Sequence, residues 1–151
     1  MAKNTIKVKK YSDVIEEYAA SGAITPGMLI ELDSATTVGF HSTASGNALP
    51  MFALEDELQG NGIDDDYAAA DRVQCWVPYR GDIVYALLDD GEDVSVGDFL
   101  ESAGNGKLQK HVADSTGDIY TQSIVAQAIE AVDMSGSSGE DPDGRIQVRI
   151  V

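Results

Sequence analysis

Short hydrophobic runs separated by turn residues dominate the chain and predict an all-β protein. The clearest run is 145–151, where apolar and polar side chains alternate as they do in a strand with one buried face. Strands are also predicted at 28–32, 36–41, 49–54, 73–77, 83–88, 99–101, 107–110 and 124–132. About nine short strands at this spacing are typical of a compact barrel or sandwich.

Two segments fit both helix and strand. In 11–20, Asp13 and Glu16 have the spacing of a capping box, which would start a two-turn helix. The same segment alternates in the manner of a strand, and 124–132 is similarly mixed. We favour strands for both, because the rest of the chain has β character.

Glycine and proline mark the turns between these strands. Pro26 and Gly27 occupy the central positions that a type II turn prefers. Gly104-Asn105-Gly106 is a hairpin signal that joins 99–101 to 107–110. The turn at 24–27 also belongs to a nine-residue pattern, 24–32, which recurs at 94–102 with glycine and glutamate in the same places. This repeat predicts two equivalent corners of a barrel.

An acidic excursion, 55–71, follows the predicted strand 49–54. It contains the triplet Asp64-Asp65-Asp66 and few aliphatic side chains, so we expect it to bury little. One helical turn capped by Asp64 is predicted at 65–70. We expect the excursion to be either disordered or held in place by a partner.

Composition favours a single domain. A chain of 151 residues can bury a substantial core without disulfides, and Cys75 is the only cysteine, so we interpret it as a core filler. No apolar run is long enough for a transmembrane helix, and the N-terminus does not have the pattern of a signal peptide. We therefore expect a protein made in a reducing host cytoplasm, with a domain at 11–151 preceded by an arm at 1–10.

Charge separates this arm from the rest of the chain. The net charge is −16, which argues against nucleic-acid binding through phosphates, but the first ten residues contain four lysines and no acid. Basic and apolar side chains alternate in 5–9, which suits a strand added to the edge of a partner's sheet. A frayed, solvated terminus is the simpler alternative. The predicted partner-binding residues are Lys3, Ile6, Lys7, Val8, Lys9 and Lys10.

No catalytic constellation is evident from the sequence. His41 and His111 lack a second metal-type ligand at short spacing, and no serine lies in a nucleophile elbow. The acidic clusters 64–66, 89–93 and 140–144 could bind calcium weakly, but none has EF-hand spacing. We predict no enzyme activity, no cofactor and no metal site, and we keep a calcium-dependent adhesion module as the alternative.

Two stretches, LPMFALEDELQGNGIDDDYAAADRV and GDIVYALLDDGEDVSVGDFLESAGNGKLQK, resemble the small capsid decoration (cement) proteins of tailed bacteriophages. The resemblance implies a β-rich, non-enzymatic virion protein on the outer surface of the expanded capsid. It also implies that the major capsid protein is the partner, that adjacent capsid subunits are clamped, and that the protein is a homotrimer. The family has no catalytic residues to carry over.

Overall fold

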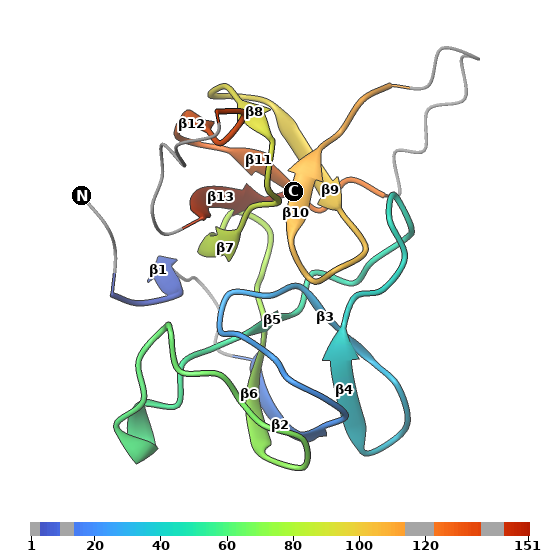
Figure 1. Ribbon diagram of the computed structural model, residues 1–151, viewed down its shortest axis with the longest axis vertical. Helices are drawn as coiled ribbons and strands as arrows, with labels where there is room; N and C mark the ends of the chain where they lie inside the picture. Colours follow the sequence, from blue (N-terminus) through green and yellow to red (C-terminus); the bar gives the residue numbers. More distant parts are fainter. Residues whose placement is uncertain (1–3, 10–13, 114–122, 137–143) are drawn as a thin grey trace.

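The computed structural model describes residues 4–9, 14–113, 123–136 and 144–151. These residues form β-strands and one 3-10 helix, Glu57–Gln59, so the all-β class is confirmed (Figure 1). The strands are β1 Lys7–Lys9, β2 Val14–Ala20, β3 Ile30–Leu32, β4 Thr37–Phe40, β5 Phe52–Ala53, β6 Arg72–Val77, β7 Ile83–Leu87, β8 Asp93–Val94, β9 Phe99–Ser102, β10 Leu108–Lys110, β11 Ala126–Ala128, β12 Val132–Asp133 and β13 Arg145–Ile150.

Strands β2 to β6 form a closed ring, which we call the first half. Its sheet has the order β3-β4-β2-β6-β5, in which β2 and β4 run parallel and the other neighbours antiparallel. A bridge between Leu29, just before β3, and Phe52 in β5 joins the two ends of this sheet. The first half occupies the lower part of Figure 1, and its strands surround a small core.

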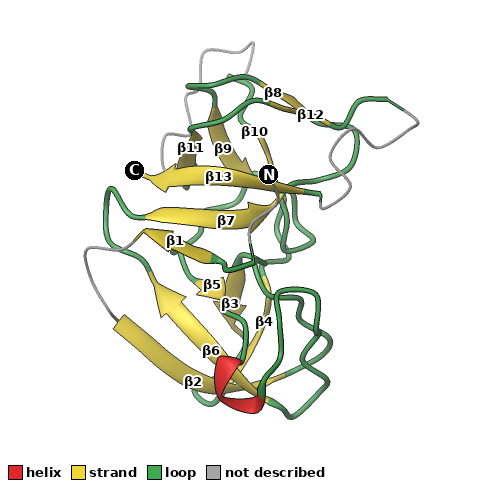
Figure 2. Ribbon diagram, turned by 90° about the vertical axis from the view of Figure 1, so that its left-hand side faces the viewer, coloured by secondary structure: helices red, strands yellow, loops and turns green. Residues whose placement is uncertain are grey.

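Strands β7 to β13 repeat this arrangement in the second half. The order β7-β13-β11-β9-β10 lies within a six-stranded sheet, and a parallel bridge between Leu88 and Leu108 joins β7 to β10. This parallel contact corresponds to the pairing of β2 with β4, where Ala20 lies opposite Val38. Figure 2 shows the two groups of strands one above the other.

The equivalence of the halves extends to individual residues. The β3–β4 register, Ile30 opposite Phe40, recurs 70 residues later as Leu100 opposite Lys110. Gly27 and Gly97 have φ angles of 93° and 94°. Their N–H groups donate to the carbonyls of Ala53 and Ala128 at 2.8 and 2.9 Å. The nine-residue repeat therefore marks two equivalent corners, as predicted, and the whole topology is duplicated.

The cores follow the same duplication. Nine buried residues form the core cluster of the first half, and each has a buried counterpart in the second. The pairs are Ala20/Leu88, Ile24/Val94, Ile30/Leu100, Val38/Leu108, Met51/Ala126, Ala53/Ala128, Tyr67/Val132, Val73/Ile146 and Cys75/Val148. Cys75 is thus a buried core side chain, as interpreted from the sequence, and burial raises its pKa to about 12.

Arg145, at the start of β13, joins the halves. Its guanidinium is buried and donates to the carbonyl of Pro26 in the first half and to that of Ile63, both at 2.7 Å. It also lies over the ring of Tyr85, 5.9 Å from the centroid. A buried cation needs such partners because desolvation is unfavourable for a charge.

Other local predictions have mixed outcomes. Segment 11–20 is a strand where described, and both predicted turns are present, with Met28 N–H donating to Thr25 O at 3.1 Å. The helical turn predicted at 65–70 is wrong: the 3-10 helix lies at Glu57–Gln59, where the Asp56 side chain caps Gln59 N. The predicted strand 124–132 is divided into two strands. β11 belongs to the ring of the second half, where it pairs with β9 and β13, whereas β12 pairs with β8.

Candidate interaction surfaces

The N-terminal residues pair with the chain's own sheet. β1 runs antiparallel to β7, with Lys7 opposite Val84 and Lys9 opposite Ile83, and the N–H of Tyr85 donates to Ile6 O at 2.8 Å. The side chain of Ile6 is fully buried. The alternating pattern of 5–9 thus forms an edge strand within its own molecule.

Glu55 anchors this N-terminal segment. Its carboxylate accepts hydrogen bonds from Thr5 Oγ1 at 2.6 Å and from Ile6 N at 3.2 Å. Of the six predicted partner-binding residues, Lys3 and Lys10 lie outside the described residues. Lys7 and Val8 are half-buried and Lys9 is exposed, so Lys9 presents the most surface to a partner. Capsid contact by this segment remains a prediction.

The acidic excursion is held by the chain itself, which corrects the expectation of disorder or a partner. Tyr67 bridges to Ile24, and its hydroxyl donates to Leu54 O at 2.7 Å. Burial raises the pKa of Tyr67 to about 12, so the hydroxyl remains a donor at any physiological pH. Ile63 is buried, and Asp64 Oδ1 lies 3.6 Å from Arg145 Nη2. Two buried side chains, Tyr67 and Ile63, and the ion pair with Arg145 therefore anchor a segment that is otherwise polar.

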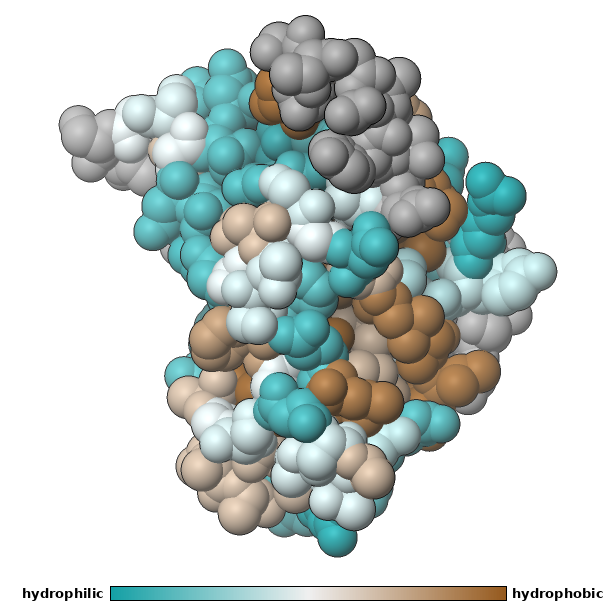
Figure 3. All heavy atoms as spheres, turned by 90° about the vertical axis from the view of Figure 1, so that its right-hand side faces the viewer, coloured by the Kyte–Doolittle hydropathy of each residue, from teal (hydrophilic) through white to brown (hydrophobic). Residues whose placement is uncertain are grey.

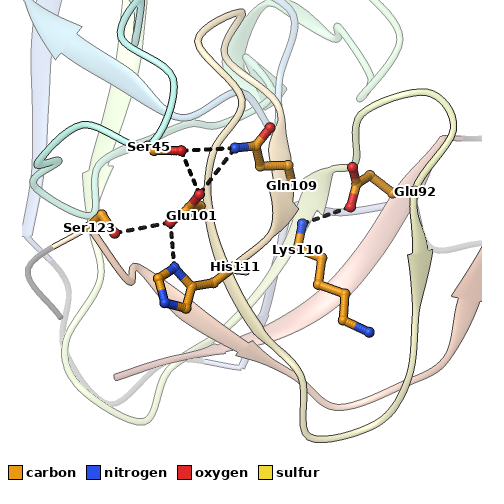
Figure 4. A network of polar contacts seen from close by, with 7 residues as sticks. All are labelled: Ser45, Glu92, Glu101, Gln109, Lys110, His111 and Ser123. Atoms are coloured by element: carbon orange, nitrogen blue, oxygen red, sulfur yellow. Dashed lines mark hydrogen bonds and ion pairs between the residues drawn. The ribbon is translucent and has the colours of Figure 1, made fainter. Parts of the chain in front are cut away.

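A buried glutamate, Glu101 on β9, is the centre of a polar network (Figure 4). Its carboxylate accepts from Ser45 Oγ at 2.6 Å, Gln109 Nε2 at 3.1 Å and Ser123 Oγ at 3.0 Å, and pairs with His111 Nδ1 at 2.5 Å. Burial alone would raise the pKa of Glu101, but these four hydrogen bonds outweigh burial and lower it. The network stabilises the ionised carboxylate. It also joins β9 and β10 to Ser45, in the connection between β4 and β5, and to Ser123, in the connection between β10 and β11.

The first half contains the equivalent pair, Glu31 and His41. Their positions precede Glu101 and His111 by 70 residues, and His41 Nε2 lies 3.7 Å from Glu31 Oε2. His41 is buried and also contacts Ser102 Oγ at 2.7 Å and Asn47 O at 3.1 Å, whereas the Glu31 carboxylate accepts from Ser42. This repeated pair was missed because the sequence comparison stopped at 32 and 102. Extended without gaps to 24–41 and 94–111, the comparison would have found both histidines.

The serines beside these histidines are not arranged as nucleophiles. Ser123 donates to the Glu101 carboxylate, whereas a hydrolytic serine donates to an imidazole. Ser102 does contact His41, but it is completely buried, where no substrate carbonyl could approach it. The geometry of both sites therefore supports structural roles.

Several other acidic side chains of the described residues each have a separate partner. Asp65 accepts from Gly62 N, Asp90 pairs with Lys107, and Glu92 accepts from Lys110 N, as drawn in Figure 4. No three His, Cys, Asp or Glu side chains of the described residues converge in a way that could hold a metal ion. The cluster at 140–144 lies almost wholly outside the described residues. Likewise, the described part of the chain contains no helix long and apolar enough to span a membrane.

Exposed hydrophobic side chains form another possible contact region. On the face in Figure 3, hydrophobic side chains gather across the middle, next to a hydrophilic upper area. On β3, β4 and the connection that follows β4, the exposed large hydrophobic residues are Leu32, Phe40 and Leu49. On β2 they are Val14 and Ile15. The first half therefore presents apolar surface beyond its own core.

Comparison with solved structures shows a likeness in fold to a phage protein. The fold is similar to the crystal structure of the head fiber gp8.5 N base of bacteriophage phi29, with a TM-score of 0.53 and 16% identity. The match covers 91% of this chain and 93% of the phage protein. No known protein-family profile and no curated protein sequence matches the chain. At this identity the likeness establishes a shared fold over nearly the whole length of both chains.

Proposed function

We propose that this chain is a structural protein of a bacteriophage virion that binds the outer surface of the expanded capsid. The likeness in fold to a phage head fiber base, over almost the full length of both chains, carries this proposal. The sequence resemblance to capsid decoration proteins is an independent argument for it. The strong negative charge is consistent with contacts to protein rather than to nucleic acid.

The mechanism we propose is clamping of adjacent major capsid subunits. A protein that binds only the expanded lattice stabilises that state by its differential affinity, and so opposes the outward pressure of packed DNA. Because many copies bind one shell, a modest free energy per site is sufficient. We propose a homotrimer as the binding unit, which sedimentation equilibrium of the purified protein tests directly.

The basic edge strand is the contact we assign to the capsid. Lys9 is exposed and Lys7 half-exposed on β1, and both lie on a chain that is otherwise strongly acidic. Deleting residues 2–10 would be a poor test, because it removes β1 and the fully buried Ile6 and would disturb the fold. Charge reversal, Lys9→Glu, leaves the buried contacts in place.

Binding to isolated capsids tests the proposal. Heads prepared without the protein, in expanded and unexpanded forms, are mixed with purified protein and sedimented. We expect saturable binding to expanded heads only, and a higher temperature of shell rupture when the protein is bound. Lys9→Glu should weaken binding, whereas the matched control Lys107→Glu, which loses a pair with exposed Asp90, should not. Absence of binding to expanded heads, or binding without any change in rupture temperature, would exclude the clamp.

A further inference from the structure

The equivalent strands β7 and β2 differ in how much of one edge is paired with another strand. β7 pairs with β13 on one side, and β1 covers the start of its other side at Ile83 and Val84. β2 is the equivalent strand, and it pairs with β6 along its length. On its other side β2 meets β4 at Ala19 and Ala20 only, and no other strand of the described residues lies there.

The open edge of β2 presents backbone groups in the right orientation for pairing. Ala19 N–H donates to Thr36 O at 3.2 Å, on the side away from β6. Because backbone groups alternate along a strand, Ile15 and Glu17 face the same side. The residue equivalent to Glu17 is Tyr85, whose N–H donates to Ile6 O. The pairing of β1 with β7 therefore shows the geometry in which a strand can pair with the equivalent edge of β2.

The side chains around this edge also differ from those of β7. Val84 and Tyr85 are buried, whereas the equivalent residues of β2, Glu16 and Glu17, are exposed. β2 also exposes Val14 by 49% and Ile15 by 38%. Exposed apolar edge strands are usually protected, since they promote pairing with other chains. A partner strand with apolar and basic side chains would complement both features of β2.

We propose that the edge of β2 over residues 14–18 binds an extended segment of another protein by antiparallel strand addition. The segment has alternating apolar and basic side chains, as residues 5–9 of this chain do. We assign the segment to the major capsid subunit, an assignment that depends on the proposed function, whereas the edge itself does not. β1 of the same molecule is already paired with β7, so it does not fill this edge.

A peptide tests the edge without any capsid. The probe is the sequence of residues 4–9, Asn-Thr-Ile-Lys-Val-Lys, added to the full chain, with binding followed by backbone amide chemical shifts. We expect shifts centred on β2. Ile15→Pro removes an N–H that faces the open edge and leaves the β2–β6 pairing, so it should weaken peptide binding about tenfold. Glu17→Lys gives a second variant in case proline disturbs the strand, and it should weaken binding through charge.

Matched controls make the outcome decisive. Glu57→Lys makes the same charge change on an exposed residue of the 3-10 helix and should leave peptide binding unchanged. A peptide with both lysines replaced by glutamate should bind more weakly than the probe. Shifts centred on β7, or equal affinity for the unmodified chain and both β2 variants, would overturn the proposed edge.

Capsid binding then tests the occupant. We expect Ile15→Pro to lower occupancy on expanded heads, with Glu57→Lys as the control. Peptide binding at β2 together with unchanged head occupancy would overturn the capsid segment as occupant and leave the proposed function intact. Self-association that Ile15→Pro abolishes would instead assign the edge to a second copy. Failure of the unmodified chain to bind heads at all would count against the proposed function as well as this occupant.

Discussion

The two halves have the same strand pairings but place equivalent residues in different surroundings. Arg72 and Arg145 begin β6 and β13, yet Arg72 is exposed whereas Arg145 is buried between the halves. Trp76 is fully buried, whereas its counterpart in β13, Arg149, is exposed. The comparison teaches that the ring of strands depends on the repeated pattern, whereas a residue's role depends on which half packs against it.

The contact between the halves explains most of these differences. Leu29, Phe52 and Trp76 lie in the first half but belong to the core cluster of the second. Their counterparts are Phe99, Gln127 and Arg149, all of which are exposed or half-buried. One face of the first half therefore packs against the second half, whereas the equivalent face of the second half is exposed to solvent.

Replacing Trp76 should give the largest difference between equivalent positions. Trp76→Ala removes a fully buried indole and should lower the free energy of unfolding by about 4 kcal/mol. Arg149→Ala should change it by less than about 0.5 kcal/mol, since the residue is exposed. Urea denaturation of both variants measures the contrast. Similar losses for the two would mean that the halves do not pack through this face.

The two corner glycines test the same contact at the backbone. Both have φ near 93°, so an alanine is strained at either position, by about 1 kcal/mol. At Gly27 a Cβ atom would also overlap Arg145 Nη1 and lie 3.2 Å from Tyr85 O, whereas at Gly97 nothing lies within 4 Å. Gly27→Ala should therefore destabilise by about 3 kcal/mol and Gly97→Ala by about 1 kcal/mol in thermal unfolding. Equal effects would show that Arg145 moves away freely.

The two Glu–His pairs should respond differently to loss of charge. Glu101→Gln disturbs a buried carboxylate with four hydrogen-bond donors and should lower the free energy of unfolding by about 2 kcal/mol, whereas Glu31→Gln should lower it by less than about 1 kcal/mol. Because folding lowers the pKa of Glu101, its contribution is present above the ordinary value of 4.5 and is lost as the pH falls below it. Unfolding followed from pH 7 to pH 3 measures this, and Glu101→Gln should flatten the acid limb. An unaltered acid limb would contradict the assigned role.

Cys75 should give the smallest effect. Its counterpart in the second half is Val148, and both are completely buried. Cys75→Val should change the free energy of unfolding by only about 1 kcal/mol, because valine adds about one methyl group and is the residue that the equivalent position of the second half accommodates. The raised pKa and burial also predict that a thiol reagent labels Cys75 only on unfolding, which labelling with and without urea would show. Rapid labelling of the folded chain would contradict the burial.

Much of the fold could be predicted from local patterns. The alternation in 145–151, the glycine turns at 24–27 and 104–106 and the nine-residue repeat each survive in the structure, because turn chemistry and period-two burial act over a few residues. The similarity of RVQCWV at 72–77 to RIQVRI at 145–150 was also in the sequence and would have extended the repeat. The helical turn was misplaced by several residues because acidic clusters offer more than one cap.

The sequence by itself determined the all-β class, the corners of the two rings and the acidic character of the surface, because periodicity, turn residues and charge are local properties. Only the tertiary structure decided that β1 returns to the chain's own β7, that Arg145 rather than Arg72 is buried, and that no described strand pairs with the outer edge of β2 over residues 14–18. These outcomes depend on contacts between segments far apart in the chain, where two nearly equivalent positions compete and packing between the halves selects one.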